Sequence, residues 1–256
     1  MDETWREEYR LYARLPVFAR RVERAKAIIA EALARTDVSW LVACSFGKDS
    51  LSMLDLILEQ RPDITVFHMD SGYCLPELYE VRDWFAQERG IRLHIKPGEM
   101  DYVTFLREFG LPAITRTAAQ QQRVVQRFKK SASEQWAFDR GFNGTFLGLR
   151  REESRDRDVS LRLRSPIYRM KSDMWKCCPL ADWTGKDVWA YIVSRNLPYP
   201  RFYDYTALGD TREKIRSTSW VTTDGAEWGR IVWLKYYYPA LYQKLAREFP
   251  EVTRYA

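Results

Sequence analysis

The 256-residue chain has 41 lysine and arginine residues against 35 aspartate and glutamate residues, for a net charge of +6. Hydrophobic residues make up 46% of the sequence, enough for a substantial core, but no run approaches the roughly 18–20 apolar residues of a membrane span. The first ten residues are polar and acidic, unlike a signal peptide, so we expect a cytoplasmic protein without a membrane partner. The basic excess suits an anionic substrate or a nucleic acid.

The four cysteines and two histidines offer little for a metal or disulfide site. No two cysteines have the C-x-x-C spacing, so neither a disulfide framework nor a zinc site is expected. Cys44 falls in a predicted core strand, where packing is the expected role of a thiol.

The N-terminal part predicts two helices, a strand and a third helix. Residues 1–16 form a short helical lead-in, and 17–35 an amphipathic helix with charged residues on its outer face. The apolar run 41–44 predicts a buried strand, which leads through 45–50 into a periodic apolar segment ending at Leu58. This is the pattern of a strand, a loop and a helix.

Residues 45–50, SFGKDS, have the composition of a phosphate-binding loop. Backbone N–H groups and the helix dipole at a helix N-terminus favour an anion. Gly47 lets the backbone approach a ligand closely, Lys48 adds a positive charge, and Ser45 and Ser50 add hydroxyl donors. The predicted ligand is a phosphate or pyrophosphate, and the alternative is a tight strand–helix turn that binds nothing.

Two more strands, 64–69 and 91–96, flank a helix at 75–89. Strands and helices that alternate at these lengths predict an α/β protein with a parallel sheet and helices on both faces. Ligands of such sheets bind beyond the carboxyl ends of the strands, so we expect the loops 45–50 and 70–74 to face one cleft.

The middle of the chain is rich in basic residues. A strand at 143–149 opens into the arginine-rich stretch 150–157, which is either a polyanion site or an exposed charged loop. Before it, a short helix is predicted at 102–109 and a long polar helix at 117–140. The long helix is either a solvated basic face or a surface that contacts phosphates. The basic residues of this stretch are Arg116, Arg123, Arg127, Lys129 and Lys130.

The C-terminal part is aromatic. Residues 198–205 predict an irregular loop, and 226–255 a helical region rich in Trp and Tyr, whose expected role is packing rather than base stacking. We therefore expect one domain over 1–205, including its N-terminal helices, and a helical extension over 206–256.

The loop at 45–50 resembles the PP-loop, S-x-G-K-D-S, of the ATP pyrophosphatases, with Phe46 at the variable position. The resemblance implies that ATP is cleaved to AMP and pyrophosphate, and that the loop holds the β- and γ-phosphates. The matching residues are Ser45, Gly47, Lys48, Asp49 and Ser50.

Three further segments resemble the PAPS reductase-like branch of the adenine nucleotide α-hydrolase superfamily. Asp70-Ser71-Gly72 resembles its D-[ST]-G segment, which lies near the nucleotide, and 179–184 resembles its P-[IL]-x-x-W-[ST] segment. The resemblance covers roughly residues 20–205 and implies a Rossmann-like parallel twisted sheet with helices on both faces, plus the helical extension. The branch's G-x-R-x-x-E-S-x-x-R signature is met by Gly148, Arg150, Glu153, Ser154 and Arg157.

Departures from the family pattern reduce the number of family activities that this chain could have. Reductases that act on PAPS usually lack the Lys-Asp pair and carry a nucleophilic cysteine in a tail, whereas this chain keeps Lys48 and Asp49 and has no cysteine after Cys178. Iron–sulfur members need a Cys-Cys and C-x-x-C set, but in 216–223, the region that would hold the last pair, serine and threonine stand where the cysteines would be. We therefore expect no iron–sulfur cluster.

The resemblance thus implies an ATP pyrophosphatase that uses ATP and Mg²⁺ to adenylate an anionic acceptor. We favour sulfur incorporation into DNA, a phosphorothioation with a cysteine desulfurase as the sulfur donor. A sulfate adenylyltransferase small subunit, a PAPS reductase and a non-catalytic nucleotide-binding subunit stay open. The sequence does not indicate an oligomeric state.

The resemblance assigns roles to particular residues. Arg150, Arg151, Arg155 or Arg157 would position the acceptor, and Asp49 or Asp70 would assist a magnesium ion, Asp70 being alternatively only a cap of its turn. Cys177 or Cys178 is a candidate persulfide carrier, with a buried thiol pair as the alternative. Catalytic roles fall to Lys48, Asp49, Arg150 and Arg157, and nucleotide binding to Ser45, Phe46, Gly47, Lys48, Asp49, Ser50, Asp70, Ser71, Gly72, Gly148, Arg151, Glu153 and Ser154.

Overall fold

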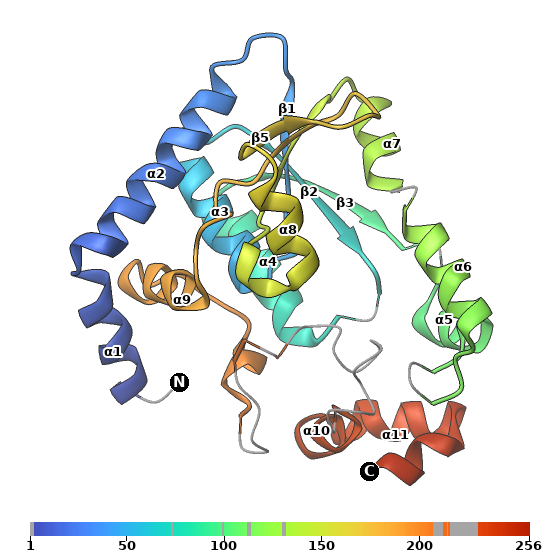
Figure 1. Cartoon of the computed structure of the whole chain (residues 1–256). Coiled ribbons are helices and arrows are strands. Elements are labelled where there is room, and N and C mark those ends of the chain that lie inside the picture. The colour runs from blue at the N-terminus through green and yellow to red at the C-terminus, as the bar shows by residue number, and fades with distance from the viewer. Residues whose placement is uncertain are drawn as a thin grey trace. The chain divides into compact units, whose positions relative to one another are not determined.

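The computed structural model of the chain (Figure 1) describes residues 3–72, 74–98, 100–111, 114–129, 132–206, 212–213, 215 and 230–256. The chain divides into two compact units, each built from several segments. The predicted domain boundary at residue 205 stays a prediction. The first unit contains Met1–Met69, Leu78–Lys96 and Ser133–Pro200, and the second contains Asp70–Glu77, Pro97–Ala132 and Arg201–Ala256.

A six-stranded sheet in the order β3-β2-β1-β4-β6-β5 forms the centre of the first unit. β1 pairs in parallel with β2 on one side and with β4 on the other, β4 pairs in parallel with β6, and β5 is antiparallel. This confirms the predicted α/β class and the mainly parallel sheet. The strands are β1 (Trp40–Ala43), β2 (Thr65–Asp70), β3 (Arg92–Pro97), β4 (Gly144–Leu147), β5 (Ile167–Arg169) and β6 (Trp175–Cys177).

The strand order reverses at β1. The chain passes from β1 to β2 and β3 on one side and then returns to β4 on the other side. Where such a reversal occurs, a crevice forms beyond the carboxyl ends of the two strands, and ligands of α/β sheets bind there. The segments 45–50 and 148–150 follow β1 and β4, so the topology brings both to this point.

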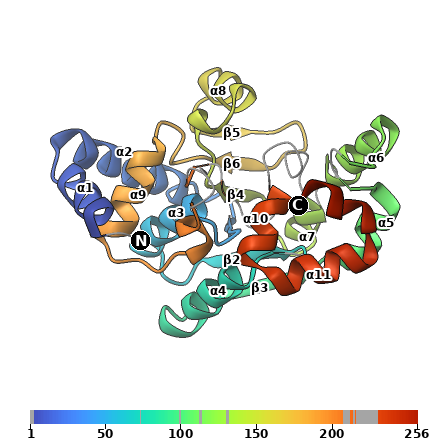
Figure 2. The ribbon, with the colours of Figure 1, turned by 90° about the horizontal axis from the view of Figure 1, so that it is seen from below.

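Helices cover both faces of the sheet (Figure 2). On one face, Leu41 and Phe67 of the sheet form a buried cluster with Ala137 of α7 (Ala132–Phe138). Within the described residues, none of the helices is both long enough and apolar enough to span a bilayer. The helices on the opposite face include α1 (Glu3–Ala13), α2 (Pro16–Leu33), α3 (Lys48–Leu58) and α9 (Gly185–Ser194).

The structure departs from the predicted elements at several points, among them helix α8 (Arg155–Arg162), which is not predicted. Strands β5 and β6 are not predicted, because three residues are too few for an alternating pattern. The predicted helix 117–140 is two helices, α6 (Ala118–Lys129) and α7, with 130 and 131 outside the described residues. Helix α3 begins at Lys48, so the second half of the predicted loop is the first helical turn.

The second unit joins the segment after β2 to the C-terminal helices. Oε1 of Glu77 accepts hydrogen bonds from the hydroxyls of Tyr205 at 3.2 Å and Tyr238 at 2.6 Å. Trp233 is buried and donates its indole N–H to the carbonyl of Tyr205, which supports the packing role expected for the aromatic residues. Its helices are α5 (Tyr102–Phe109), α6, α10 (Arg230–Tyr237), α11 (Pro239–Glu248) and the 3-10 helix Pro250–Tyr255.

The described basic residues of the stretch 116–130 make contacts within the second unit. Arg116 donates from Nε to the carbonyl oxygen of Phe109 at 2.9 Å, and Arg123 pairs with Glu108 at 2.9 Å. Arg123 thus joins α6 to α5, and Arg116 joins the segment before α6 to the end of α5. The side chains of Arg127 and Lys129, and the whole of Lys130, lie outside the described residues.

One fully buried carboxylate joins three helices of the first unit. Asp55 of α3 accepts hydrogen bonds from Arg89 at 2.8 Å, Tyr191 at 2.9 Å and Arg195 at 3.1 Å. Burial, together with the nearby Asp55, raises the pKa of Tyr191, so its hydroxyl stays a donor. These contacts fix α9 and the end of α4 (Pro76–Glu88) against α3, whose first turn lies at the crevice.

We expect Asp55→Ala to lower the free energy of unfolding by about 3–5 kcal/mol, because two arginines then lose a buried counter-charge. Urea denaturation monitored by circular dichroism measures the change. The control is Glu88→Ala, an exposed carboxylate at the end of α4, which should change stability by less than about 0.5 kcal/mol. Equal stability of the two variants would contradict the role given to Asp55.

Candidate functional site

The carboxyl ends of β1 and β4 lie side by side because the strands pair in register, with Ala43 opposite Leu147. A Cβ atom on Gly148 would lie 3.1 Å from both Cα and N of Ser50. Glycine at 148 therefore lets the chain beyond β4 lie directly against the first turn of α3. The structure thus brings together the two motifs that carry most of the expected site residues.

A buried aromatic side chain anchors the loop. Phe46 has a φ of +56°, a left-handed conformation that is rare for a bulky residue. Its ring is fully buried, with its centroid 5.2 Å from the ring of His68 and 6.4 Å from that of Phe85. The side chain at the variable position of the motif, Phe46, therefore anchors the loop in the core. The residue type alone gives no sign of this backbone conformation, so it is not predicted from the sequence.

The start of α3 presents backbone donors. Gly47 is its N-cap residue, with a φ of −78°, and it supplies no side-chain cap. The first N–H groups of a helix have no intrahelical acceptor, so they are suited to bind an anion. The hydroxyl of Ser50 donates to the carbonyl of Gly47 at 3.0 Å and lies 3.2 Å from that of Ser45. The two serines thus stabilise this turn.

A chain of alternating charges links the first turn of α3 to the segment after β4. Nζ of Lys48 lies 2.7 Å from one carboxylate oxygen of Asp49, and Nε of Arg150 lies 2.5 Å from the other. Arg150 also donates to Glu152 at 2.8 Å, and Glu152 accepts the backbone N–H of Gly185, the first residue of α9, at 2.5 Å. Only 4% of Lys48 and 1% of Arg150 are exposed.

The charge state of Asp49 follows from these contacts. Burial by itself would raise the pKa of Asp49, but the charges of Lys48 and Arg150 outweigh it and lower the pKa below its usual value. Asp49 is therefore ionised at neutral pH. Its carboxylate holds one cation from each motif in place beside the amino end of α3.

The segment after β4 is a tightly bonded turn. Glu153 accepts the backbone N–H of Arg150 at 2.9 Å and forms an ion pair with Arg157. Ser154 accepts the backbone N–H of Arg157 at 3.2 Å and so caps α8 (Arg155–Arg162). The residues of the signature that follow Arg150 therefore shape this turn, which in turn fixes Arg150.

The remaining expected arginines differ in their contacts. Arg151 pairs with Asp158 at 2.9 Å and with Asp182 at 3.0 Å. Arg155 is exposed and makes no ion pair with the residues that the structure describes. Of the four arginines expected to position an acceptor, Arg155 is therefore the one best placed to bind a ligand from solvent.

An open hollow of about 990 Å³ adjoins this segment between α2 and the start of α8. Arg20 on its rim is exposed and, within the described chain, is not part of an ion pair. Trp183 and Thr184, from the expected P-L-A-D-W-T segment, form part of its wall. We call this hollow the arginine groove, after Arg20, Arg21, Arg24, Arg151 and Arg155 in its lining. Guanidinium groups bind phosphate and carboxylate groups bidentately.

The segment Asp70-Ser71-Gly72 belongs to the second unit. A carboxylate oxygen of Asp70 accepts the backbone N–H of Gly72 at 2.8 Å, and its carbonyl accepts that of Gly98 at 2.5 Å. Ser71 Oγ lies 3.4 Å from the thiol of Cys74. Asp70 thus makes the turn-capping contact that was one of its two expected roles. Its contact with a nucleotide or magnesium, and a cleft shared with 45–50, stay predictions.

The adjacent thiols at the end of β6 are buried. Cys177 and Cys178 have no exposed surface, and burial raises the pKa of both, that of Cys178 to about 11. Burial also raises the pKa of Cys44 to about 12. These thiols stay protonated near neutral pH, and a sulfur donor cannot reach them. For Cys177 and Cys178, this supports the role of a buried thiol pair rather than that of a persulfide carrier. Cys74 is partly exposed.

The described residues do not bring three or more His, Cys, Asp or Glu side chains together as metal ligands. Both carboxylate oxygens of Asp49 already contact cations. Mg²⁺ in nucleotide sites commonly takes one or two carboxylates together with the phosphates of the substrate. A magnesium ion at this site would therefore be held mainly by such phosphates. The expected absence of an iron–sulfur cluster stays a prediction.

Residues 39–214 match the family model of the phosphoadenosine phosphosulfate reductase domain. A phosphoadenosine 5'-phosphosulfate reductase of Xanthomonas campestris is 31% identical over 194 residues, covering 73% of this chain and 76% of that protein. One from Xylella fastidiosa is 30% identical over 178 residues, covering 66% of this chain and 70% of that protein.

Solved structures show the same fold at lower identity. The phosphoadenylyl-sulfate reductase of Candida auris, in a phosphate complex, has a TM-score of 0.55 at 17% identity, covering 80% of this chain and 92% of that chain. The FMN adenylyltransferase of Candida glabrata has a TM-score of 0.50 at 14% identity, covering 78% of this chain and 65% of that chain. These two likenesses concern the fold alone.

We expect Asp49→Asn to lower the free energy of unfolding by about 3 kcal/mol at pH 7, because Lys48 and Arg150 lose their counter-charge. The pKa of Asp49 is lower in the folded state than in the unfolded state, so its stabilisation is present above the unfolded pKa of about 4 and is lost as the pH falls through the folded value. Urea denaturation between pH 7 and pH 3 should show that the difference in free energy of unfolding between the wild type and Asp49→Asn becomes smaller as the pH falls. A gap that is constant with pH would contradict this role.

Iodoacetamide should modify Cys74 in the folded protein much faster than the three buried cysteines, which should react only after denaturation. Peptide mass spectrometry after timed quenching measures each rate, and Cys74→Ser is the control that removes the fast phase. Alkylation of Cys177 or Cys178 in the folded protein as fast as that of Cys74 would restore them as sulfur carriers.

Proposed function

The chain belongs to the phosphoadenosine phosphosulfate reductase domain family, and from this premise we propose that it is an ATP pyrophosphatase that adenylates an anionic acceptor. The arrangement that carries the proposal is the set of Lys48, Asp49 and Arg150 at the amino end of α3, in which both cations are buried. A cation, an uncapped helix start and the positive end of the helix dipole coincide there. Such a site matches the charge of a triphosphate tail.

In the proposed step, an oxygen atom of the acceptor attacks the α-phosphorus of ATP. The bond from this phosphorus to the oxygen bridging to the β-phosphate breaks, and pyrophosphate leaves with the electron pair. The AMP group stays on the acceptor. Lys48 and the N–H groups of the first turn of α3 stabilise the negative charge that develops on pyrophosphate. Magnesium bound with the phosphates would neutralise more of this charge.

Lys48 is suited to stabilise the leaving group because it is positioned before ATP binds. Only 4% of Lys48 is exposed, and its ammonium group lies 2.7 Å from Asp49, which Arg150 contacts from the other side. Electrostatic stabilisation by a group that need not reorient is commonly the largest contribution to catalysis. Arg150 therefore acts mainly as a positioning residue in this proposal, since its guanidinium is occupied by Asp49 and Glu152.

The acceptor in this proposal is a DNA phosphate that binds along the arginine groove. Arg20 and Arg155 offer exposed guanidinium groups, and Glu152 joins the lining of the groove to Arg150. A cysteine desulfurase would then deliver the sulfur nucleophile that displaces AMP. An external sulfur carrier agrees with the burial of Cys177 and Cys178.

A second candidate is the reduction of PAPS, because the curated relatives carry that name. Cleavage of a sulfonate by a cysteine needs an accessible thiolate. Three of the four cysteines are buried, and the pKa of each of these three is raised by burial, which weighs against this candidate within the sequence given. Cys74 is the thiol that a reductase test must address.

We expect Lys48→Ala to reduce release of pyrophosphate from ATP by at least about a hundredfold, since one electrostatic donor contributes this much in comparable sites. A coupled phosphate assay with an added pyrophosphatase measures the rate. The control is Lys186→Ala, an exposed lysine at the start of α9, which should keep the wild-type rate. Unchanged turnover by a folded Lys48→Ala variant would show that the loop assignment is wrong.

The acceptor is identified by adding one compound at a time to ATP and Mg²⁺. Stimulation of pyrophosphate release by DNA favours DNA modification, and stimulation by sulfate favours a sulfate adenylyltransferase. Reduction of PAPS with thioredoxin, lost in Cys74→Ser, favours the reductase. Tight binding of ATP without turnover favours a non-catalytic subunit.

A further inference from the structure

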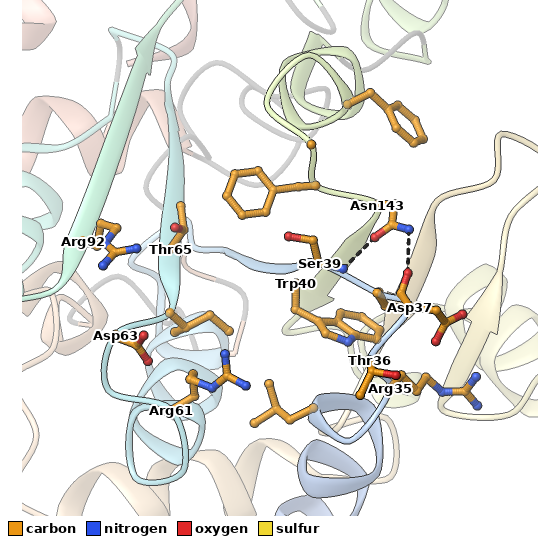
Figure 3. Close-up of a pocket in the computed structure, with 16 residues that line it drawn as sticks. Arg35, Thr36, Asp37, Ser39, Trp40, Arg61, Asp63, Thr65, Arg92 and Asn143 are labelled. Carbon is orange, nitrogen blue, oxygen red and sulfur yellow. Dashed lines mark hydrogen bonds between the residues drawn. The ribbon is translucent and has the colours of Figure 1, made fainter.

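Two hollows in the first unit differ in the helix ends beside them. The arginine groove adjoins the starts of α8 and α9, where the positive end of a helix dipole favours an anion. The second hollow, of about 750 Å³, lies where the parallel strands begin, and Arg61 and Arg92 are part of its lining (Figure 3). α2 and α3 end beside it, and the negative ends of their dipoles disfavour an anion there. The arginine groove is therefore the better anion site of the two.

Three of the five arginines in the arginine groove are already paired with carboxylates. Arg21 lies 3.4 Å from the buried Asp187, and Arg24 lies 3.2 Å from Asp182. Arg151 also pairs with Asp182, at 3.0 Å. These carboxylates offset much of the charge of the three guanidinium groups, so the other two arginines provide most of the attraction for an anionic ligand.

The charged groups that remain open to a ligand are Arg20, Arg155 and Glu152. Both arginines are exposed and, within the part of the chain that the structure describes, form no ion pair. Glu152 lines the same groove, and 53% of its side chain is exposed. Its buried partner Arg150 is shared with Asp49, so Arg150 offsets the charge of Glu152 only in part. A ligand in the groove therefore meets two cations and one carboxylate.

The carboxylate of Glu152 is fixed at the wall of the groove. Its Oε2 accepts hydrogen bonds from Nη1 of Arg150 at 2.8 Å and from the backbone N–H of Gly185 at 2.5 Å. Gly185 begins α9, so the positive end of that helix dipole also holds the negative charge. Oε1 accepts no hydrogen bond from the described residues. A bound anion therefore faces a carboxylate that is held in place by two donors.

A fixed carboxylate repels an anion in proportion to the charge of that anion. A phosphodiester of DNA carries one negative charge, whereas a phosphomonoester, with a second pKa of about 6, carries close to two at pH 8. The two open arginines attract the dianion more strongly, and the carboxylate reduces that advantage. The cost of taking a dianion out of water is also larger than that for a monoanion. The combination favours a singly charged ligand.

We propose that Glu152 is a specificity-determining residue, which makes the arginine groove accept a singly charged phosphodiester and disfavour dianions such as a terminal phosphomonoester or sulfate. This rests on the proposed function, in which the groove binds the acceptor. Position 152 is a variable position of the G-x-R-x-x-E-S-x-x-R signature, so the resemblance to the family assigns it no role.

The test measures competition for the groove rather than turnover. The full chain binds a fluorescein-labelled oligothymidine of ten nucleotides, and fluorescence anisotropy at pH 8 reports its displacement. The competitors are thymidine 5'-monophosphate, a dianion at this pH, and its methyl ester, a monoanion with the same nucleoside. Ionic strength is held constant, because binding of DNA depends on salt.

In the wild type, the methyl ester should displace the oligonucleotide at least as well as the monophosphate does. In Glu152→Gln, the IC50 should fall about tenfold for the monophosphate and about threefold for the methyl ester, because the lost repulsion acts on twice the charge in the dianion. Sulfate should gain as the monophosphate does. Lys48→Ala should leave the ratio of the two IC50 values at its wild-type value, which separates the groove from the 45–50 loop.

Matched controls place the oligonucleotide in the groove. Arg20→Ala/Arg155→Ala should weaken its binding at least tenfold, whereas Arg61→Ala/Arg92→Ala in the second hollow should leave it unchanged. Glu88→Gln, at the end of α4, should leave the ratio of IC50 values unchanged. If Glu152→Gln does not fold, the wild type is titrated at pH 5, where the monophosphate is mainly a monoanion and its IC50 should approach that of the methyl ester.

Equal changes for the two competitors in folded Glu152→Gln, tighter wild-type binding of the monophosphate than of its methyl ester, or a ratio that is the same at pH 5 and pH 8 would overturn the role of Glu152. DNA binding that does not depend on Arg20 and Arg155 would overturn it together with the assignment of the acceptor to the groove. Release of pyrophosphate from ATP is measured separately. DNA that binds the groove without stimulating this release would contradict the proposed function and leave the charge selection by Glu152 standing.

Discussion

The ion pair between Arg150 and Asp49 holds the two parts of the candidate site together. Asp49 lies in the first turn of α3 and Arg150 follows β4, so this contact spans the point where the strand order reverses. Arg150 is almost completely buried, and a buried guanidinium is tolerated only with close, well-directed partners. Once that pair forms, Lys48 has its counter-ion and a fixed position, and the turn after β4 has its orientation.

The basic residues of the site fall into two groups, one buried and paired with acidic residues and the other exposed. Lys48 and Arg150 are buried and bonded to acidic partners, so Lys48 suits a ligand that must be held in one position, and Arg150 positions Lys48 through Asp49. Arg20 and Arg155 are exposed on the arginine groove, so they suit a larger anion that approaches from solvent. A rigid anion site beside a more open basic surface is consistent with a reaction that joins a nucleotide to a second, bulkier substrate.

The sequence predicts the mainly parallel sheet, because the sheet follows from the strand–helix alternation. It does not predict that the segment after β4 lies against the first turn of α3, since the loops expected to face one cleft are 45–50 and 70–74. It does not predict β5 and β6, which are too short to show a periodic pattern. It also misses the left-handed backbone of Phe46, since no residue preference signals a bulky side chain in that conformation. The burial of Cys177 and Cys178 depends on contacts between distant segments, which a local pattern does not contain.

The proposed reaction requires a phosphate tail bound at the amino end of α3, and calorimetric titration tests this binding directly. We predict a saturable heat for ATP and for pyrophosphate, competition between the two, and no heat for adenosine, which has no phosphates. The absence of heat with ATP and pyrophosphate, or equal binding of ATP and adenosine, would contradict the account.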